Sequence, residues 1–281
     1  MKFTTCSKIP GIAASMTLVF GLSVIRAFGA DAASDTAANY ASSWSATPAN
    51  LGSGFGAWNN QVINNNNPPY SGTYLDETSY GNSDGVLSAG YAWATYANTP
   101  GTVTPEMILS RPFTAGPSGS SSLYNQTFSA GIGSSGVGGS GSSLTVDVGT
   151  AFSLSYIGGG ADNFWLGVDG GTASAIAVPF ADLAAGLEVA LSVSGPLNSL
   201  GESYTLTFSP FSGGPAIYTT SGSFDSLDYN TSSFTFDDNN TSNNQYLNNL
   251  TITPEAVPEP SALVLSGLSG LFTLFAFRRR K

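Results

Sequence analysis

The stretch Leu144–Ile157, LTVDVGTAFSLSYI, decides the fold class. Its apolar residues alternate with Thr, Asp and Ser, and a period of two residues is typical of a strand with one packed face and one solvent face. Outward from it, the alternation returns in four further runs: Leu187–Val193, Tyr204–Phe208, Phe234–Phe236 and Leu247–Thr253. The pattern predicts antiparallel β-structure.

Turn-forming residues separate these runs at Gly158–Gly160, Asp169–Gly171, Gly195–Pro196 and Gly213–Pro215. Residues 33–256 therefore predict one all-β domain, an antiparallel, jelly-roll-like β-sandwich of about ten to fourteen strands. The Gly/Ser-rich stretch Gly116–Ser143 could also be an interdomain linker, but strand-like sequence lies on both sides of it and disfavours that interpretation. Within the domain we expect a hairpin at Leu166–Val178, a helical turn at Ala181–Glu188, and a surface loop at Gly116–Ser143 that holds one strand near Tyr124–Ile132.

Charge is scarce and one-sided. Charged residues make up 9% of the chain, against about 25% in ordinary soluble proteins. Between residues 33 and 256, sixteen Asp and Glu residues stand against a single cation, Arg111. Phosphate binding needs a cationic surface, so a nucleic-acid partner is excluded.

The side chains available for catalysis are equally restricted. The chain has no His, its one Cys is Cys6, and no Lys occurs between Lys8 and Lys281. Ser-His-Asp and Cys-His catalysis, Schiff-base chemistry and zinc sites built from His or Cys are thereby excluded. Carboxylates are the general acids and bases that remain, and we expect a protein that is not an enzyme.

The N-terminal segment, residues 1–32, reads as a secretory signal peptide. Lys2 and Lys8 precede an apolar core, Ile9–Ile25, and small residues follow it. Cleavage by signal peptidase, after passage through the Sec translocon, is expected after Gly29 or Ala32. A retained membrane anchor is the alternative, which the short, Gly- and Pro-interrupted core disfavours.

The C-terminal segment, residues 257–281, has three parts. Val257, Pro258, Glu259 and Pro260 form an extended peptide, because the prolines cannot enter a regular helix. Ser261–Phe277 carries no charge and is just long enough to span a membrane. The cations Arg278, Arg279, Arg280 and Lys281 then stop the chain on the cytoplasmic side. A buried core helix, the alternative, would leave these cations without a purpose.

This order of parts resembles the PEP-CTERM sorting signal of Gram-negative bacteria. The resemblance implies processing by exosortase at or near Val257–Pro260, a precursor anchored in the inner membrane, and delivery to the cell surface or extracellular matrix. A second resemblance rests on Arg111–Phe113, Tyr156–Gly160, Asp162–Gly167 and Asn248–Ile252. In these segments the exported domain is similar to a concanavalin A-like jelly roll, and this resemblance supports the predicted β-sandwich.

Four kinds of candidate site remain in the exported domain. Arg111 could bind a carboxylate or sugar hydroxyl, although a structural pair with an Asp is favoured. Asp237, Asp238 and Asp162, which lie among Asn and turn residues, could bind calcium through oxygen ligands. The carboxylates that could form a catalytic pair are Asp76, Glu77, Glu188, Glu202, Asp225, Asp228, Asp237 and Asp238. The aromatic residues that could stack on sugars, or pack in the core by default, are Trp44, Trp58, Tyr70, Tyr74, Tyr80, Tyr91, Trp93 and Tyr96.

Together these features favour an exported, exosortase-processed surface or matrix protein that associates with exopolysaccharide and has no catalytic activity. Two alternatives stay open: a calcium-dependent glycan-binding module, and a glycoside hydrolase or lyase that works with carboxylates. A cleft with two facing carboxylates would favour the enzyme, and an aromatic strip would favour binding.

Overall fold

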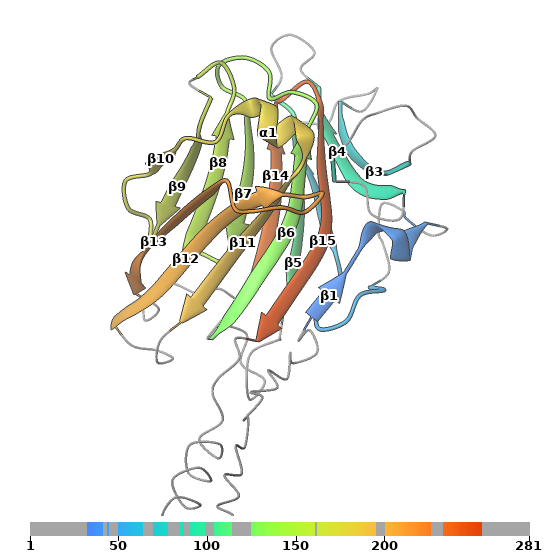
Figure 1. The fold of residues 1–281 in the computed structure, drawn as a ribbon. Coiled ribbons are helices and arrows are strands. Elements are labelled where there is room, and N and C mark those ends of the chain that lie inside the picture. Colours follow the sequence, from blue (N-terminus) through green and yellow to red (C-terminus); the bar gives the residue numbers. More distant parts are fainter. Residues whose placement is uncertain are drawn as a thin grey trace, which may run out of the picture.

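The computed structural model describes residues 33–41, 44, 50–63, 70–77, 85–86, 90–98, 104–113, 125–160, 162–194, 200–225 and 233–254. Their strands form two antiparallel sheets that lie one over the other as a sandwich (Figure 1). The predicted all-β sandwich is confirmed, with fifteen strands in the described residues, one more than expected.

The first sheet has eight strands. Its order is β13 (Tyr218–Asp225), β12 (Leu200–Pro210), β11 (Leu187–Ser194), β6 (Gln126–Ser134), β15 (Asn244–Pro254), β4 (Tyr91–Ala97) and β3 (Ser71–Glu77), and β1 (Ala33–Asp35) pairs with β15. Neighbours along the sheet are often far apart in sequence, since β6 lies between β11 and β15. The sheet is therefore complete only when strands from both halves of the chain have paired.

The second sheet has seven strands. Its order is β10 (Ser174–Ile176), β9 (Phe164–Val168), β8 (Phe152–Ile157), β7 (Ser143–Val148), β14 (Ser233–Asn239), β5 (Glu106–Pro112) and β2 (Asn59–Ile63). The stretch that indicated the fold class forms two of these strands, β7 and β8, because Gly149 turns the chain with a φ of 61°. The predicted hairpin at Leu166–Val178 is β9 and β10.

Alternation places the core between the sheets. In β7 and β8, every second side chain from Leu144 to Tyr156 is buried and the residues between them are only partly covered. Trp93 of β4 is fully buried in the same core, as the default interpretation of that aromatic predicted. Each buried Val, Leu or Phe contributes about 1.5–3 kcal/mol, so this shared core holds the two sheets together.

The Gly/Ser-rich stretch contains a central strand. We expected one strand within a surface loop, and β6 is that strand, but eight of its nine residues are buried. Gly131 and Gly133 explain the burial, because they leave room for Phe211 and Val86 against the outer face of the eight-stranded sheet. There Val86, Ala92, Ala94 and Tyr246 form a second, smaller apolar cluster.

Helices are short. The predicted helical turn is α1 (Phe180–Ala185), and η1 (Ala37–Tyr40) follows β1. No helix among the described residues is long and apolar enough to cross a membrane. The predicted signal peptide with its cleavage positions Gly29 and Ala32, and the C-terminal segment 257–281, lie outside the described residues.

Candidate functional site

The outer face of the seven-stranded sheet carries a continuous row of partly exposed side chains. Trp165, Ser155, Thr145, Asp237, Ile108 and Gln61 are paired in register in this order, one from each of β9, β8, β7, β14, β5 and β2. We call this the outer row. Five strand spacings of about 4.8 Å make it about 24 Å long. A polymer laid across the strands would contact every member of the row.

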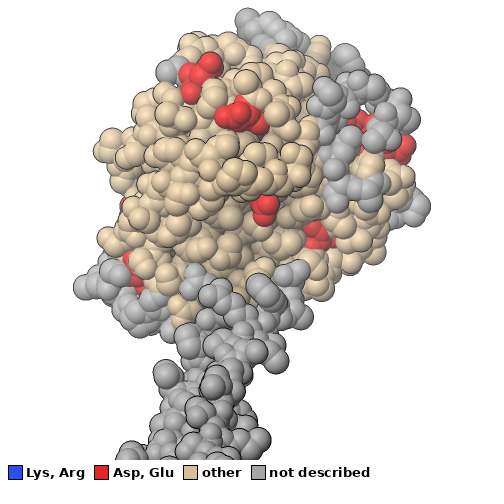
Figure 2. All heavy atoms as spheres, in the orientation of Figure 1, with Lys and Arg blue, Asp and Glu red and all other residues tan. Residues whose placement is uncertain are grey.

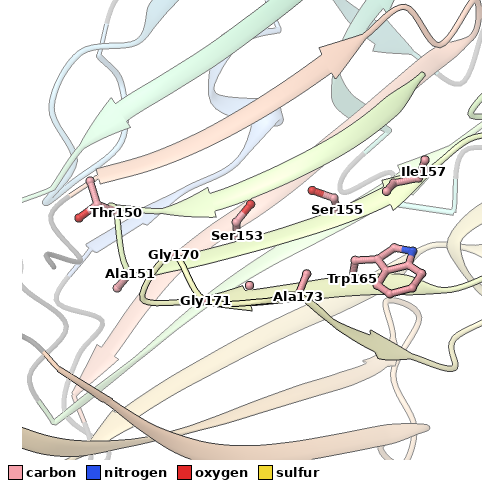
Figure 3. A pocket seen from close by; sticks show the side chains of 10 residues that line it. Thr150, Ala151, Ser153, Ser155, Ile157, Trp165, Gly170, Gly171 and Ala173 are labelled. Carbon is pink, nitrogen blue, oxygen red and sulfur yellow. The ribbon is translucent and has the colours of Figure 1, made fainter. Parts of the chain in front are cut away.

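A hollow of about 530 Å³ opens at the Trp165 end of the outer row. Figure 3 shows Ser153 and Ser155 of β8 beside Trp165 of β9. No lining residue is charged: the hollow is formed by Thr150, Ala151, Ser153, Ser155, Ile157, Trp165, Gly167, Gly170, Gly171 and Ala173. We call it the β8–β9 hollow. It combines an aromatic ring with hydroxyl groups on a rigid sheet, a combination common in ligand sites.

Three carboxylates lie at the middle of the same face. Burial, together with the nearby carboxylates of Glu106 and Asp147, raises the pKa of Asp237 to about 7. Burial also raises the pKa of Asp147, although a hydrogen bond with Ser153 opposes the shift. We call Asp237, Glu106 and Asp147 the acidic cluster. Asp237 can therefore hold a proton near neutral pH and donate a hydrogen bond.

The neighbouring Asp238 points the opposite way, into the sandwich. Its Oδ2 accepts a hydrogen bond from Thr95 Oγ1 of β4 at 3.0 Å, and its Oδ1 accepts one from Thr241 Oγ1 at 2.7 Å. Asp238 is fully buried, and burial raises its pKa to about 7 although both threonines lower it. This carboxyl connects the two sheets.

The residues predicted to bind calcium do not come together. Asp237 and Asp238 face opposite sides of β14, and exposed Asp162 accepts a hydrogen bond from the Tyr156 hydroxyl at 3.1 Å. Within the described part of the chain, no three acidic or Cys side chains are placed to hold a metal ion. These side chains do not fit a calcium site, because adjacent residues of a strand point to opposite faces.

Arg111 has the structural role that the sequence favoured. It forms a fully buried salt bridge with Asp35, and its Nη2 also donates to Asn50. Nε and Nη2 donate to the carbonyl of Gly56 at 3.0 and 2.8 Å. The guanidinium also stacks on the ring of Trp58, 4.6 Å from its centroid. With these four hydrogen bonds made in the interior, Arg111 is not presented to a ligand.

The other predicted residues do not form a site on the face described above. Trp44, Trp58 and Trp93 pack together in the core, with Trp58 and Trp93 centroids 5.0 Å apart. Asp76 of β3 and Glu202 of β12 are buried in the other sheet, and Glu188 of β11 is exposed. Tyr80 and Asp228 lie outside the described residues, as does the side chain of Asp225.

Trp165 was missed as a site residue by the sequence reasoning, although a signal was present. It stands between Phe164 and Leu166, both buried, in a strand of period two. That phase places the indole on the solvent face, where its broad apolar ring and polar N–H can contact a ligand. The alternation of buried and partly exposed residues in this short strand could therefore have identified Trp165 as a surface residue.

The exported domain is an all-β sandwich with a row of polar side chains that ends at Trp165. The C-terminal segment indicates where the chain is delivered. Residues 256–281 match the family model of the PEP-CTERM protein-sorting motif. The predicted sorting signal is confirmed. The chain is thus exported as a precursor anchored through its C-terminal segment and is then processed toward the cell surface.

Solved structures provide distant likenesses. The binding domain of Paraclostridial Mosquitocidal Protein 1 is 15% identical with a TM-score of 0.37, and the match covers 69% of this chain and 47% of that one. The Ca2+-bound exoplasmic/lumenal domain of VIP36 is 8% identical over 68% of this chain and 86% of that one, with a TM-score of 0.42. A carbohydrate esterase from the Shiga toxin-encoding bacteriophage phi24B is 10% identical over 70% and 89%, with a TM-score of 0.40.

The chain spans just under half the length of the mosquitocidal binding domain that it matches. Likenesses at these TM-scores assign neither ligand nor activity to this chain. A comparison with curated proteins finds no match to the sequence.

Proposed function

We propose that the exported domain is a non-catalytic, polysaccharide-binding protein of the cell surface or extracellular matrix. The observation that supports this function best is the outer row, which ends in the β8–β9 hollow beside Trp165. In this proposal a segment of exopolysaccharide lies across the strands, and export to the cell surface supports contact between the domain and that polymer.

The chemistry of the face matches the surface of a sugar chain. A sugar ring has an apolar face of C–H groups and a rim of hydroxyls, and the Trp165 indole offers a broad apolar surface for the former. The hydroxyls of Ser153, Ser155 and Thr145 and the carboxylates of the acidic cluster can exchange hydrogen bonds with the latter. Because these groups stand on paired strands, little entropy is lost when they are fixed in the complex.

Retention on the host's own exopolysaccharide tests the proposal. The purified domain is incubated with the polymer, and both bound protein and newly released reducing ends are measured. We expect retention without release, and a loss of affinity of about tenfold or more for Trp165→Ala. Ile217→Ala is the matched control, because Ile217 is 43% exposed on the turn between β12 and β13. If Trp165→Ala binds the polymer as tightly as the unsubstituted domain, the outer row is not the binding site.

A carboxylate-based glycoside hydrolase is the second candidate, favoured by the acidic cluster alone. Asp237 can be protonated near pH 7, which suits a general acid. Asp147 lies diagonally across from it, and diagonal strand neighbours are about 7–8 Å apart, within the range of glycosidase pairs. Release of reducing ends that disappears in both Asp237→Asn and Asp147→Asn would establish this function in place of the first.

We further propose the sites of processing. Signal peptidase cleaves after Gly29 or Ala32, and exosortase removes the segment that follows Glu259, including Arg278–Lys281. Intact-mass measurement of the protein from its native host checks both ends. A surface form that retains Arg278–Lys281 would exclude cleavage by exosortase, and Pro258→Ala with Pro260→Ala is expected to leave the precursor uncleaved in the membrane.

A further inference from the structure

We infer that the polysaccharide which fits this face is an electrically neutral, hydroxyl-rich chain, and that anionic chains such as polyuronates are rejected. The inference rests on the proposed function and specifies its ligand class. It follows from the distribution of charge around the outer row, from the chemistry of its hydrogen-bonding groups and from the space above Trp165.

The described surface has no cation to offer an anionic sugar. Arg111 is the one basic residue between Phe28 and Phe277, and its side chain is fully buried against Asp35. On the side of the eight-stranded sheet, Figure 2 likewise shows acidic side chains and no basic one on the described part of the surface. Carboxylate and phosphate groups are recognised in proteins chiefly by Arg and Lys. An anionic chain would find no such partner here.

The groups that do line the row suit sugar hydroxyls. The β8–β9 hollow is uncharged, and beyond Ser155 and Thr145 the row reaches the acidic cluster, in which neighbouring carboxylates already raise the pKa of Asp237. A bound uronate carboxylate would add a further negative charge to this cluster and be repelled. A neutral hydroxyl can instead donate to these carboxylates, and hydrogen bonds to an ionised acceptor are among the stronger ones.

Small residues keep the indole accessible. Gly167 follows Trp165 on the same face of β9, and a Cβ there would meet only Ser153, at 3.8 Å, an ordinary contact distance. Valine is favoured in strands, so Gly167→Val can be accommodated by the sheet while its methyl groups project into the β8–β9 hollow beside the Trp165 ring. This substitution blocks the site without removing a hydrogen-bonding group. Ser221→Val, on an exposed position of β13 in the other sheet, is the matched control.

Carboxyl reduction of the host's exopolysaccharide tests the ligand class, because it converts uronic acids to neutral sugars on the same backbone. Native and carboxyl-reduced polymer are immobilised, and the affinity of the domain for each is measured at low and high salt. We expect the reduced polymer to bind as well as the native one or better, with little dependence on salt. Gly167→Val is expected to lower both affinities about tenfold or more, and Ser221→Val to leave them unchanged.

The outcomes separate the two proposals. Loss of binding after carboxyl reduction would overturn the neutral ligand class and leave polysaccharide binding intact. The same holds if retention of the native polymer requires calcium and is abolished by a chelator, because calcium would then bridge acidic groups on both sides. Binding that Gly167→Val does not change would overturn the site. Failure of both polymers to bind would overturn the proposed function itself.

Discussion

Asp35 and Asp237 are carboxylates of strands in the same sandwich, in opposite surroundings. Asp35 is fully buried, yet its oxygens accept hydrogen bonds from Arg111, from Tyr40 at 2.7 Å and from Asn39 at 2.8 Å. Asp237 is partly exposed, has no cation beside it and faces the carboxylates of Glu106 and Asp147. The comparison teaches that burial alone does not mark a functional acid. The functional candidate is the carboxylate whose charge the fold leaves uncompensated.

The Asp35 region is also where the chain holds its two sheets together. Asp35 belongs to β1, which pairs with β15 in the eight-stranded sheet, whereas Arg111 belongs to β5 in the seven-stranded sheet. The salt bridge therefore joins the N-terminal strand of one sheet to a strand of the other. Either partner alone would be a buried charge without compensation, so the two charges depend on each other.

The largest effect is expected from Arg111→Met. The substitution leaves the Asp35 carboxylate buried without its cation, and removing one partner of a buried pair typically costs about 3–5 kcal/mol. Domains of this kind have about 5–15 kcal/mol of stability in total, so the variant should unfold at much lower denaturant concentration. Urea unfolding of the variant and of the unsubstituted domain measures the difference.

Arg111→Met combined with Asp35→Leu sharpens the comparison. Replacing both charges by apolar side chains of similar size removes the uncompensated carboxylate, so the double variant should recover part of the lost stability. A double variant less stable than Arg111→Met alone would show that the salt bridge is not the source of the effect.

Asp238 is intermediate between Asp35 and Asp237, because it is buried but its hydrogen-bond partners are neutral. Asp238→Ala is expected to lower the free energy of unfolding by about 1–3 kcal/mol. Its oxygens accept from two neutral hydroxyls, Thr95 and Thr241, so the variant loses the connection between the sheets and leaves buried donors unsatisfied. Asp162→Ala is the control, because Asp162 is exposed and contacts only the Tyr156 hydroxyl among the described hydrogen bonds. Thermal unfolding of both variants checks the order, which equal losses would contradict.

Much of the fold could be predicted because alternation is a local signal. Leu144–Ile157 shows which residues of β7 and β8 face the core, without any knowledge of their partners. The same signal covered Asp237 and Asp238: Phe234 and Phe236 are buried, so the phase of β14 turns Asp238 inward and Asp237 outward. Treating the two aspartates as one calcium site overlooked this phase.

The outer row could not be predicted because register is not local. Trp165, Thr145 and Asp237 come together only through the pairing of β9, β8, β7 and β14, and β14 lies about eighty residues beyond β8 in the chain. Arg111 was expected to pair with an Asp, but its partner, Asp35, is 76 residues away. Sequence patterns indicate which face a side chain takes, and tertiary pairing decides its neighbours.

The smallest effect is expected from Asp237→Asn, and its sign depends on pH. The pKa of Asp237 is about 7 in the folded domain and about 3.9 in an unfolded chain. Between these values the folded state holds a proton that the unfolded state releases, so the contribution of Asp237 to stability falls as pH rises from about 4 to about 7. Asparagine mimics the protonated form and avoids this loss.

Asp237→Asn should therefore match the unsubstituted domain near pH 4 and be more stable near pH 8. We expect a gain of about 1–2 kcal/mol at the higher pH, because solvent screening reduces the effect at a partly exposed site. Glu188→Asn, an exposed acid on the other sheet, controls for the change in net charge. Urea unfolding at the two pH values measures the difference for each variant. An equal gain at both pH values, or a loss at pH 8, would show that the acidic cluster does not hold Asp237 protonated, and the contrast with Asp35 would lose its electrostatic basis.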